Sequence, residues 1–134
     1  MAELKFKPEP HILEWLLEEN NPSVRYFTLK DIQKIPENNP LLKAAKKTIM
    51  TKGPVPKILS KQQPEGCWAE PMKFYRNKYK GTVWQLIILA SLGTDGKDKR
   101  IKKACEFILK HSQDKKSGGF STDYSVTAKC GLNS

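Results

Sequence analysis

One pattern occurs twice in this chain, fifty residues apart, and it restricts the possible folds more than any other feature. Each copy places a Gln, a Gly and an aromatic residue after an Ile-Leu pair: Gln63, Gly66 and Trp68 in the first copy, and Gln113, Gly118 and Phe120 in the second. A repeat of this length that contains two helices cannot bury its apolar side alone and must stack on its neighbours. We therefore predict an all-α protein of stacked helical hairpins.

Each residue type in the repeated pattern has a predicted structural task. The Gln side chain can bond backbone groups that are left free at the end of its helix, and the Gly permits a tight turn. The aromatic ring can fill the groove between neighbouring helices. We expect these residues to fasten successive repeats together, which is a role in stability rather than in catalysis.

Two helix starts are marked by an asparagine followed by a proline, at Asn21 and at Asn39. An asparagine side chain can accept from a free N–H group, and proline suits the first helical position. The sequence predicts helices over residues 22–35 and 40–52, paired as a hairpin. The spacing of apolar residues predicts their inward faces: Val24, Phe27, Thr28, Ile32 and Ile35, and then Leu41, Leu42, Ala45 and Ile49. A shorter helix before them carries an apolar stripe of Ile12, Trp15 and Leu16.

The second half of the chain contains a helix, over residues 82–92, that is apolar on every side. Such a helix must be surrounded by others, so we predict that it is the innermost one. We expect a homo-oligomer, another protein partner or a further segment to cover it. A short helix over residues 54–63 and an aromatic loop over residues 64–81 precede it. An amphipathic helix over residues 99–111 follows, capped by Asp98, with these residues facing inward: Ile101, Ala104, Cys105 and Ile108.

The length of 134 residues fits one domain, with repeats over about residues 10–63 and 64–122. Residues 123–134 are predicted to start a further helix or to form a frayed tail. No apolar run approaches the roughly 20 residues that cross a bilayer, and no secretory signal is recognisable, so we expect a cytoplasmic protein without a membrane span. The three cysteines, Cys67, Cys105 and Cys130, are widely spaced and odd in number, which indicates reduced thiols.

The net charge of +10 would suit a partner that carries many phosphates. The lysines, however, are spread over nearly every segment, as they are on the wet faces of amphipathic helices. We therefore favour a solvated surface over a nucleic acid or anionic membrane surface as the explanation of the charge.

The repeated loops resemble the Gln-to-Trp motif of the α/α-toroid superfamily, which includes squalene cyclases, terpene cyclases and protein prenyltransferase β-subunits. Four further stretches, residues 21–26, 53–56, 79–85 and 104–107, resemble small prokaryotic prenyltransferase-like or squalene-cyclase-like proteins of unassigned activity. The resemblance covers nearly the whole chain and implies about half of a toroid.

The residues that perform chemistry in those families are missing from this sequence. Squalene-hopene-type cyclases protonate an alkene with an Asp-x-Asp-Asp cluster, and protein prenyltransferases bind zinc through an Asp-x-Cys pair and a distant His. Neither pattern occurs here, and there is no Gly-rich phosphate loop. Cys105 and His111 fall on different faces of their helix, which argues against a shared metal. We expect no catalytic residues, no metal, no cofactor and no enzyme activity in this form.

Three functions fit the sequence. The favoured one is a scaffold or binding protein that presents stacked hairpins to a protein partner. The alternative is an isoprenoid-binding protein or a fragment of a terpene cyclase-like or prenyltransferase-like enzyme, with Tyr75, Tyr79 and Trp84 as candidate ligand-binding residues. The second alternative is a binder of nucleic acid or anionic surfaces, which would use the basic and aromatic residues 72–80.

Overall fold

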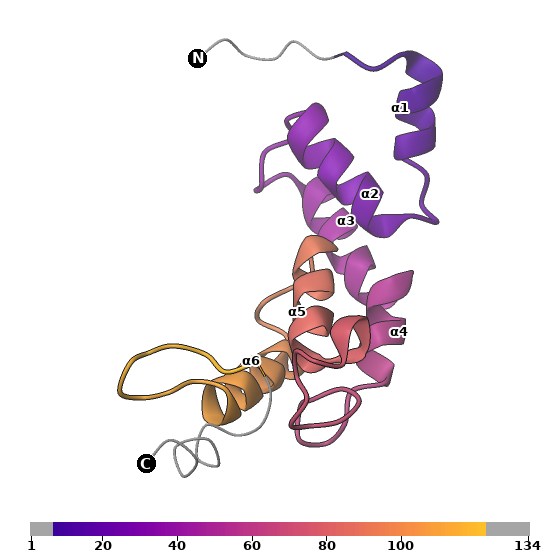
Figure 1. The fold of residues 1–134 in the computed structure, drawn as a ribbon. Coiled ribbons are helices and arrows are strands. Elements are labelled where there is room, and N and C mark those ends of the chain that lie inside the picture. The colour runs from indigo at the N-terminus through magenta and orange to yellow at the C-terminus, as the bar shows by residue number, and fades with distance from the viewer. Residues whose placement is uncertain (1–6, 123–134) are drawn as a thin grey trace. The chain divides into compact units, whose positions relative to one another are not determined.

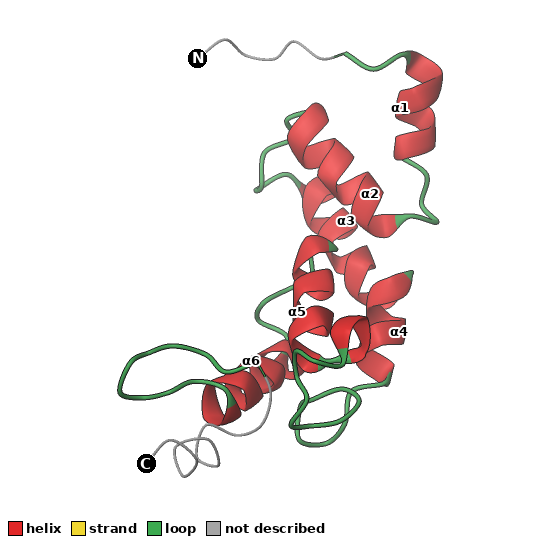
Figure 2. Cartoon of the chain, in the orientation of Figure 1, coloured by secondary structure: helices red, strands yellow, loops and turns green. Residues whose placement is uncertain are grey.

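The computed structural model describes residues 7–122, and its regular elements are helices (Figures 1 and 2). Within residues 7–122 the α-helices are α1 (Pro10–Leu16), α2 (Pro22–Phe27), α3 (Pro40–Thr51), α4 (Pro54–Ser60), α5 (Thr82–Ser91) and α6 (Lys99–His111). A π-helical turn, Thr28–Ile32, continues α2, and a 3-10 turn, Lys78–Lys80, precedes α5. No strand occurs within this described part, which confirms the all-α prediction. None of its helices is long and apolar enough to cross a membrane.

The chain divides into two compact units, one of residues 1–56 with 92–94 and one of residues 57–91 with 95–134. The division falls within α4, whereas the predicted boundary between repeats, at residues 63 and 64, lies inside the second unit. A single domain of two stacked repeats stays a prediction. The predicted further helix or tail at residues 123–134 lies outside the described residues.

The first unit is built around the packing of α2 on α3, and a π-helical turn continues α2. Its core is apolar and consists of Tyr26, Leu29, Leu42, Ala45 and Ile49. Three of these residues, on α3, were predicted to face inward. The prediction was wrong for Val24 and Leu41, which are both exposed, and it missed Tyr26 and Leu29.

Polar contacts explain why the buried face of α2 differs from the prediction. The hydroxyl of Ser23 donates to the carbonyl of Leu92 at 2.6 Å, which turns Ser23 inward and its neighbour Val24 outward. The π-helical turn then adds a residue to the helical repeat, so the 3.6-residue spacing used for the prediction fails beyond Phe27. The predicted helix also ends earlier, at Ile32 rather than Ile35.

The two predicted helix caps differ in the structure. The side chain of Asn39 accepts from the backbone N–H of Leu41 at 2.9 Å, as predicted for the start of α3. Asn21 makes no such bond, although α2 does begin at Pro22. The proline alone therefore marks the start of α2, because it occupies a position whose N–H needs no helical partner.

Helix α1 has no buried residue, contrary to the stripe predicted from Ile12, Trp15 and Leu16. The Trp15 side chain is 62% exposed, and Ile12 is exposed as well. The guanidinium of Arg25 donates to the carbonyl of Leu17 at 2.7 Å and holds the C-terminal end of α1 near α2. The helix is thus attached at its end, while its apolar side chains stay open to solvent.

The second unit packs α5 and α6 together with the loop that follows α4. Its main buried cluster consists of Cys67, Phe74 and Phe107. Helix α6 begins and ends where predicted, and Asp98 caps it by accepting from the N–H of Arg100 at 2.8 Å. The inward face was partly wrong, because Cys105 is exposed and Phe107 is buried.

The described residues cover less of the surface of helix α5 than its apolar sequence predicts. Only Thr82 and Leu89 are buried, and Ile87 is 49% exposed. An apolar helix with open faces is the feature that led us to expect a covering partner, and that expectation stays a prediction.

Candidate functional site

The first copy of the repeated motif fastens the loop after α4 onto neighbouring elements. The Trp68 ring is only 3% exposed, and its indole N–H donates to the carbonyl of Ile58 in α4 at 2.9 Å. The backbone N–H of Trp68 donates to the hydroxyl of Thr82, at the start of α5, at 3.0 Å. The Gln63 side chain donates to the carbonyl of Ala69, so it bonds within the loop and not at a helix end as predicted. Trp68, rather than Gln63, connects the loop to α4.

The second copy of the motif forms a closed loop, but its aromatic ring is not buried among the described residues. Gln113 and Phe120 pair through an isolated antiparallel bridge, and Gly118 has a positive φ of 75°. The Phe120 side chain is exposed in the described part of the chain, so it fills no groove there. The two copies share the turn geometry and differ in the packing of the aromatic residue.

The three predicted ligand-binding residues lie together and line an open hollow of about 470 Å³, which we call the aromatic hollow. The ring centroids of Tyr75 and Trp84 are 5.6 Å apart, and those of Tyr79 and Trp84 are 5.4 Å apart. Arg76, Lys78 and Thr122 complete the lining. The hollow therefore combines aromatic surface with two cationic side chains.

Backbone contacts around the aromatic hollow fix its shape. The indole N–H of Trp84 donates to the carbonyl of Tyr75 at 3.1 Å, and the side chain of Gln85 donates to the carbonyl of Tyr79. Gly81, at the start of α5, allows the turn to pass close to the loop, since a Cβ there would lie 2.6 Å from the carbonyl oxygen of Phe74. Phe74, which immediately precedes Tyr75, is fully buried and anchors the start of the segment that carries the two tyrosines. The tyrosine rings can thus stay exposed on a firmly held backbone.

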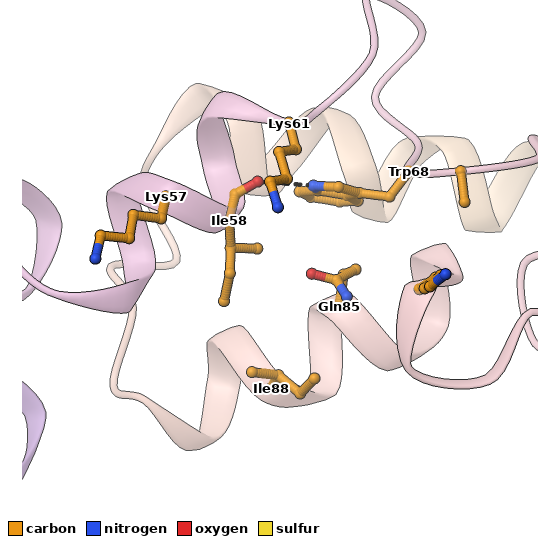
Figure 3. Close-up of a pocket in the computed structure, with 8 residues that line it drawn as sticks. Lys57, Ile58, Lys61, Trp68, Gln85 and Ile88 are labelled. Carbon is orange, nitrogen blue, oxygen red and sulfur yellow. Dashed lines mark hydrogen bonds between the residues drawn. The ribbon is translucent and has the colours of Figure 1, made fainter.

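A second hollow, of about 460 Å³, lies between α4, the Trp68 loop and α5 (Figure 3), and we call it the lysine groove. Its lining residues are Lys57, Ile58, Lys61, Trp68, Ala69, Lys80, Gln85 and Ile88. Figure 3 shows Ile58 and Ile88 on opposite sides of the space, with the Trp68 ring at one end. None of the described residues that line the lysine groove is acidic, so the groove has an apolar floor and a cationic rim.

No sequence pattern predicted the lysine groove. A local signal was present, because Lys57 and Lys61 are four residues apart and flank Ile58. Lys80 and Ile88, however, lie 19 and 27 residues after Lys61 along the chain. Only the packing of the Trp68 loop brings them to the same groove.

The titratable groups do not assemble a metal or nucleophilic site in the portion that the structure describes. No group of three or more His, Cys, Asp and Glu side chains is arranged to hold a metal ion there. Burial raises the pKa of the Cys67 thiol and the nearby Glu65 raises it further, so this thiol is a poor nucleophile at neutral pH. Burial also lowers the pKa of His111, which packs against the ring of Phe107 with centroids 4.6 Å apart. Cys130 lies outside the described residues.

Comparison with protein-family models, with curated proteins and with solved structures finds no match. The resemblance to the α/α-toroid superfamily therefore stays a prediction from the sequence motifs.

Proposed function

We propose that this chain is a helical-repeat binding protein that takes an amphipathic anion in the aromatic hollow. The observation that carries the proposal is the meeting of Tyr75, Tyr79 and Trp84 around one hollow with Arg76 and Lys78 beside them. Aromatic surface and cationic groups in one place suit a ligand with an apolar body and an anionic end.

A prenyl phosphate fits these features best. The faces of the aromatic rings can pack against the unsaturated chain, and Arg76 and Lys78 can bond phosphate oxygens. The resemblance to isoprenoid-handling toroid proteins supports the same ligand class. Nothing in this proposal requires a covalent step, because binding by rings and cations accounts for the arrangement.

Single-stranded nucleic acid is the second candidate, and the distribution of charge favours it. The second unit holds fifteen of the 24 Lys and Arg residues but only seven of the 14 Asp and Glu residues. Tyr79 is 70% exposed, so a base could stack on its ring. A salt-dependent contact with phosphates would follow from the surrounding cations.

Tryptophan fluorescence of the whole chain, titrated with three probes, tests both candidates. Farnesyl phosphate, inorganic phosphate and oligothymidylate are compared at about 50 and 300 mM salt, since binding to a polyphosphate weakens steeply over this range. We expect farnesyl phosphate to quench Trp84 and to raise Tm at both salt concentrations, and inorganic phosphate to do neither.

The matched variants are Tyr79→Ala, in the aromatic hollow, and Phe120→Ala, an exposed aromatic residue outside its lining. Removing one packing ring should weaken farnesyl phosphate binding about tenfold, and the Phe120 variant should leave it unchanged. Oligothymidylate binding that disappears at high salt, with no response to farnesyl phosphate, would establish the second candidate instead. No response to any probe would reject the aromatic hollow as a ligand site and favour a scaffold for a protein partner.

A further inference from the structure

The lysine groove requires a particular kind of occupant. Its floor, formed by Ile58, Trp68 and Ile88, can bury an apolar side chain. Its cations come from two walls, because Lys57 and Lys61 belong to α4 and its end whereas Lys80 ends the turn before α5. Within residues 7–122 none of these three lysines forms a salt bridge. A complementary ligand therefore has an apolar part with more than one carboxylate around it.

The aromatic residue of the lysine groove argues against a nucleic acid as this occupant. Bases stack on exposed aromatic faces, but the Trp68 ring is 3% exposed and its N–H is held by Ile58. The ring serves as a floor against which an aliphatic or aromatic side chain can pack. An acidic and apolar peptide segment uses both the floor and the lysines.

Helix α1 of this same chain has the required chemistry. Trp15 and Ile12 are three residues apart and exposed, so they form an apolar stripe along one side of the helix. Glu14 on α1 and Glu18, two residues beyond the end of α1 at Leu16, are also exposed. They are four residues apart in sequence, the same separation as Lys57 and Lys61 on the groove. No residue of α1 is buried, so its apolar stripe is open to another molecule.

We propose that the lysine groove binds α1 of a second copy of this chain. Trp15 of the second copy packs on Ile58, Trp68 and Ile88, while Glu14 and Glu18 pair with the lysines. This is a helix-in-groove contact, in which an amphipathic helix lays its apolar face into a hydrophobic groove. Two copies that exchange α1 make the contact twice and form a closed, symmetric dimer. The contact also covers part of α5, whose open apolar surface has no other cover in the described residues.

The size of α1 sets the strength that we expect. A helix of seven residues buries less than the roughly 1,200 Å² of a stable interface, so one contact alone is weak. Two contacts in one dimer reinforce each other, which leads to a dissociation constant on the order of 1–100 µM.

Charge reversal across the proposed contact is the test. Sedimentation velocity of the full chain over about 1–300 µM should show a monomer that converts to a dimer. Lys61→Glu and Glu18→Lys should each weaken dimerisation about tenfold or more, because each places like charges together. An equimolar mixture of the two variants should dimerise again, since one contact is then native and the other has both charges reversed. Lys102→Glu and Glu37→Lys, at exposed positions away from the contact, are the matched controls.

A second measurement does not depend on the folding of any variant. A fluorescein-labelled peptide of residues 9–20 should bind the wild-type chain, as measured by anisotropy. The same peptide with Trp15→Ala, or with its glutamates changed to glutamine, should bind about tenfold more weakly.

Four results would overturn the proposal. They are a wild-type chain that stays monomeric at about 300 µM, a mixture of variants that fails to dimerise, controls that weaken dimerisation equally, and displacement of the peptide by oligothymidylate.

Discussion

At the scale of single residues, two glycines determine how closely the loops approach the helices. Gly66 has a φ of 99°, a conformation that glycine adopts without strain, and a Cβ there would lie 2.8 Å from the carbonyl oxygen of Lys103 on α6. Gly118, its counterpart in the second copy of the motif, has a similar φ of 75°, but a Cβ there would meet no atom of the described residues within 4 Å. The loop at Gly66 therefore packs directly against α6. The loop at Gly118 has a left-handed turn but makes no comparably close contact with a described residue.

Alanine substitutions at these two glycines distinguish two contributions to the free energy of unfolding. One is the cost of a left-handed backbone, and the other is the cost of a steric clash with α6. Gly118→Ala should lower the free energy of unfolding by about 1–2 kcal/mol, the cost of a left-handed backbone in a residue with a Cβ. Gly66→Ala should lower it by about 1–3 kcal/mol more, because the added methyl group must displace the backbone of α6. Urea unfolding of the two variants and of Gly96→Ala, which has neither constraint, measures both terms. Equal losses for Gly66 and Gly118 would mean that the contact with Lys103 contributes nothing.

At the scale of elements, Asp98 and Arg100 together begin α6. The carboxylate of Asp98 accepts from both the backbone N–H and the guanidinium of Arg100, at 2.8 to 3.0 Å. The hydrogen bond from the Arg100 side chain lowers the pKa of Asp98 below its ordinary value of 3.8. A carboxyl group whose pKa is lowered on folding stabilises the protein above that ordinary value, and the stabilisation is lost as the pH falls through the folded pKa.

Substitution of Asp98 should therefore have two distinguishable effects. Asp98→Ala removes the cap and should cost about 1 kcal/mol at neutral pH. Asp98→Asn keeps an acceptor but has no charge to lose, so it should be milder, and its stability should fall less than that of the wild type as the pH decreases below about 4. Thermal unfolding followed by circular dichroism between neutral pH and about pH 2.5 measures both effects. Parallel losses in the wild type and the Asn variant would contradict the role of this carboxylate.

Sequence patterns predicted the elements better than their buried faces. The boundaries of α6 and its cap at Asp98 follow from local chemistry, and the sequence contains that information directly. The inward face of α2 could not be predicted, because it depends on a bond from Ser23 to Leu92, far along the chain. Cys105 was misplaced for a similar reason, since Phe107 supplies the larger buried side chain on α6.

The candidate sites differ in the same way. Tyr75, Tyr79 and Trp84 were found from sequence because all three lie within ten residues of one another in a segment rich in aromatic and basic residues. The lysine groove was missed because its walls come from α4 and from α5, and no local pattern connects Lys57 to Ile88. A site that depends on a loop folding back between two helices needs tertiary structure to be recognised.

At the scale of the whole molecule, the positive charge is unevenly distributed. Residues 1–56 and 92–94 carry nine basic and seven acidic residues, whereas the other unit carries fifteen and seven. A net charge far from zero destabilises a folded chain through self-repulsion, and salt screens that repulsion over distances of about 10 Å at 0.1 M. The second unit should therefore respond more strongly to salt than the first.

We expect that raising sodium chloride from about 20 to 200 mM stabilises the second unit by roughly several tenths of a kcal/mol and the first unit by much less. Amide hydrogen exchange can resolve this difference, because it reports the free energy of local opening along the chain. Protection should increase in α5 and α6 and change little in α2 and α3. Replacing Lys102 and Lys110, which are exposed on α6, with glutamine should reduce the gain because it removes part of the repulsion. An equal gain in both units, or one that the glutamine variant retains in full, would show that repulsion among these lysines does not limit the stability of the second unit. The excess charge would then hardly lower the stability of the folded chain. Its effect would be confined to the rate at which the chain associates with an anionic ligand or partner.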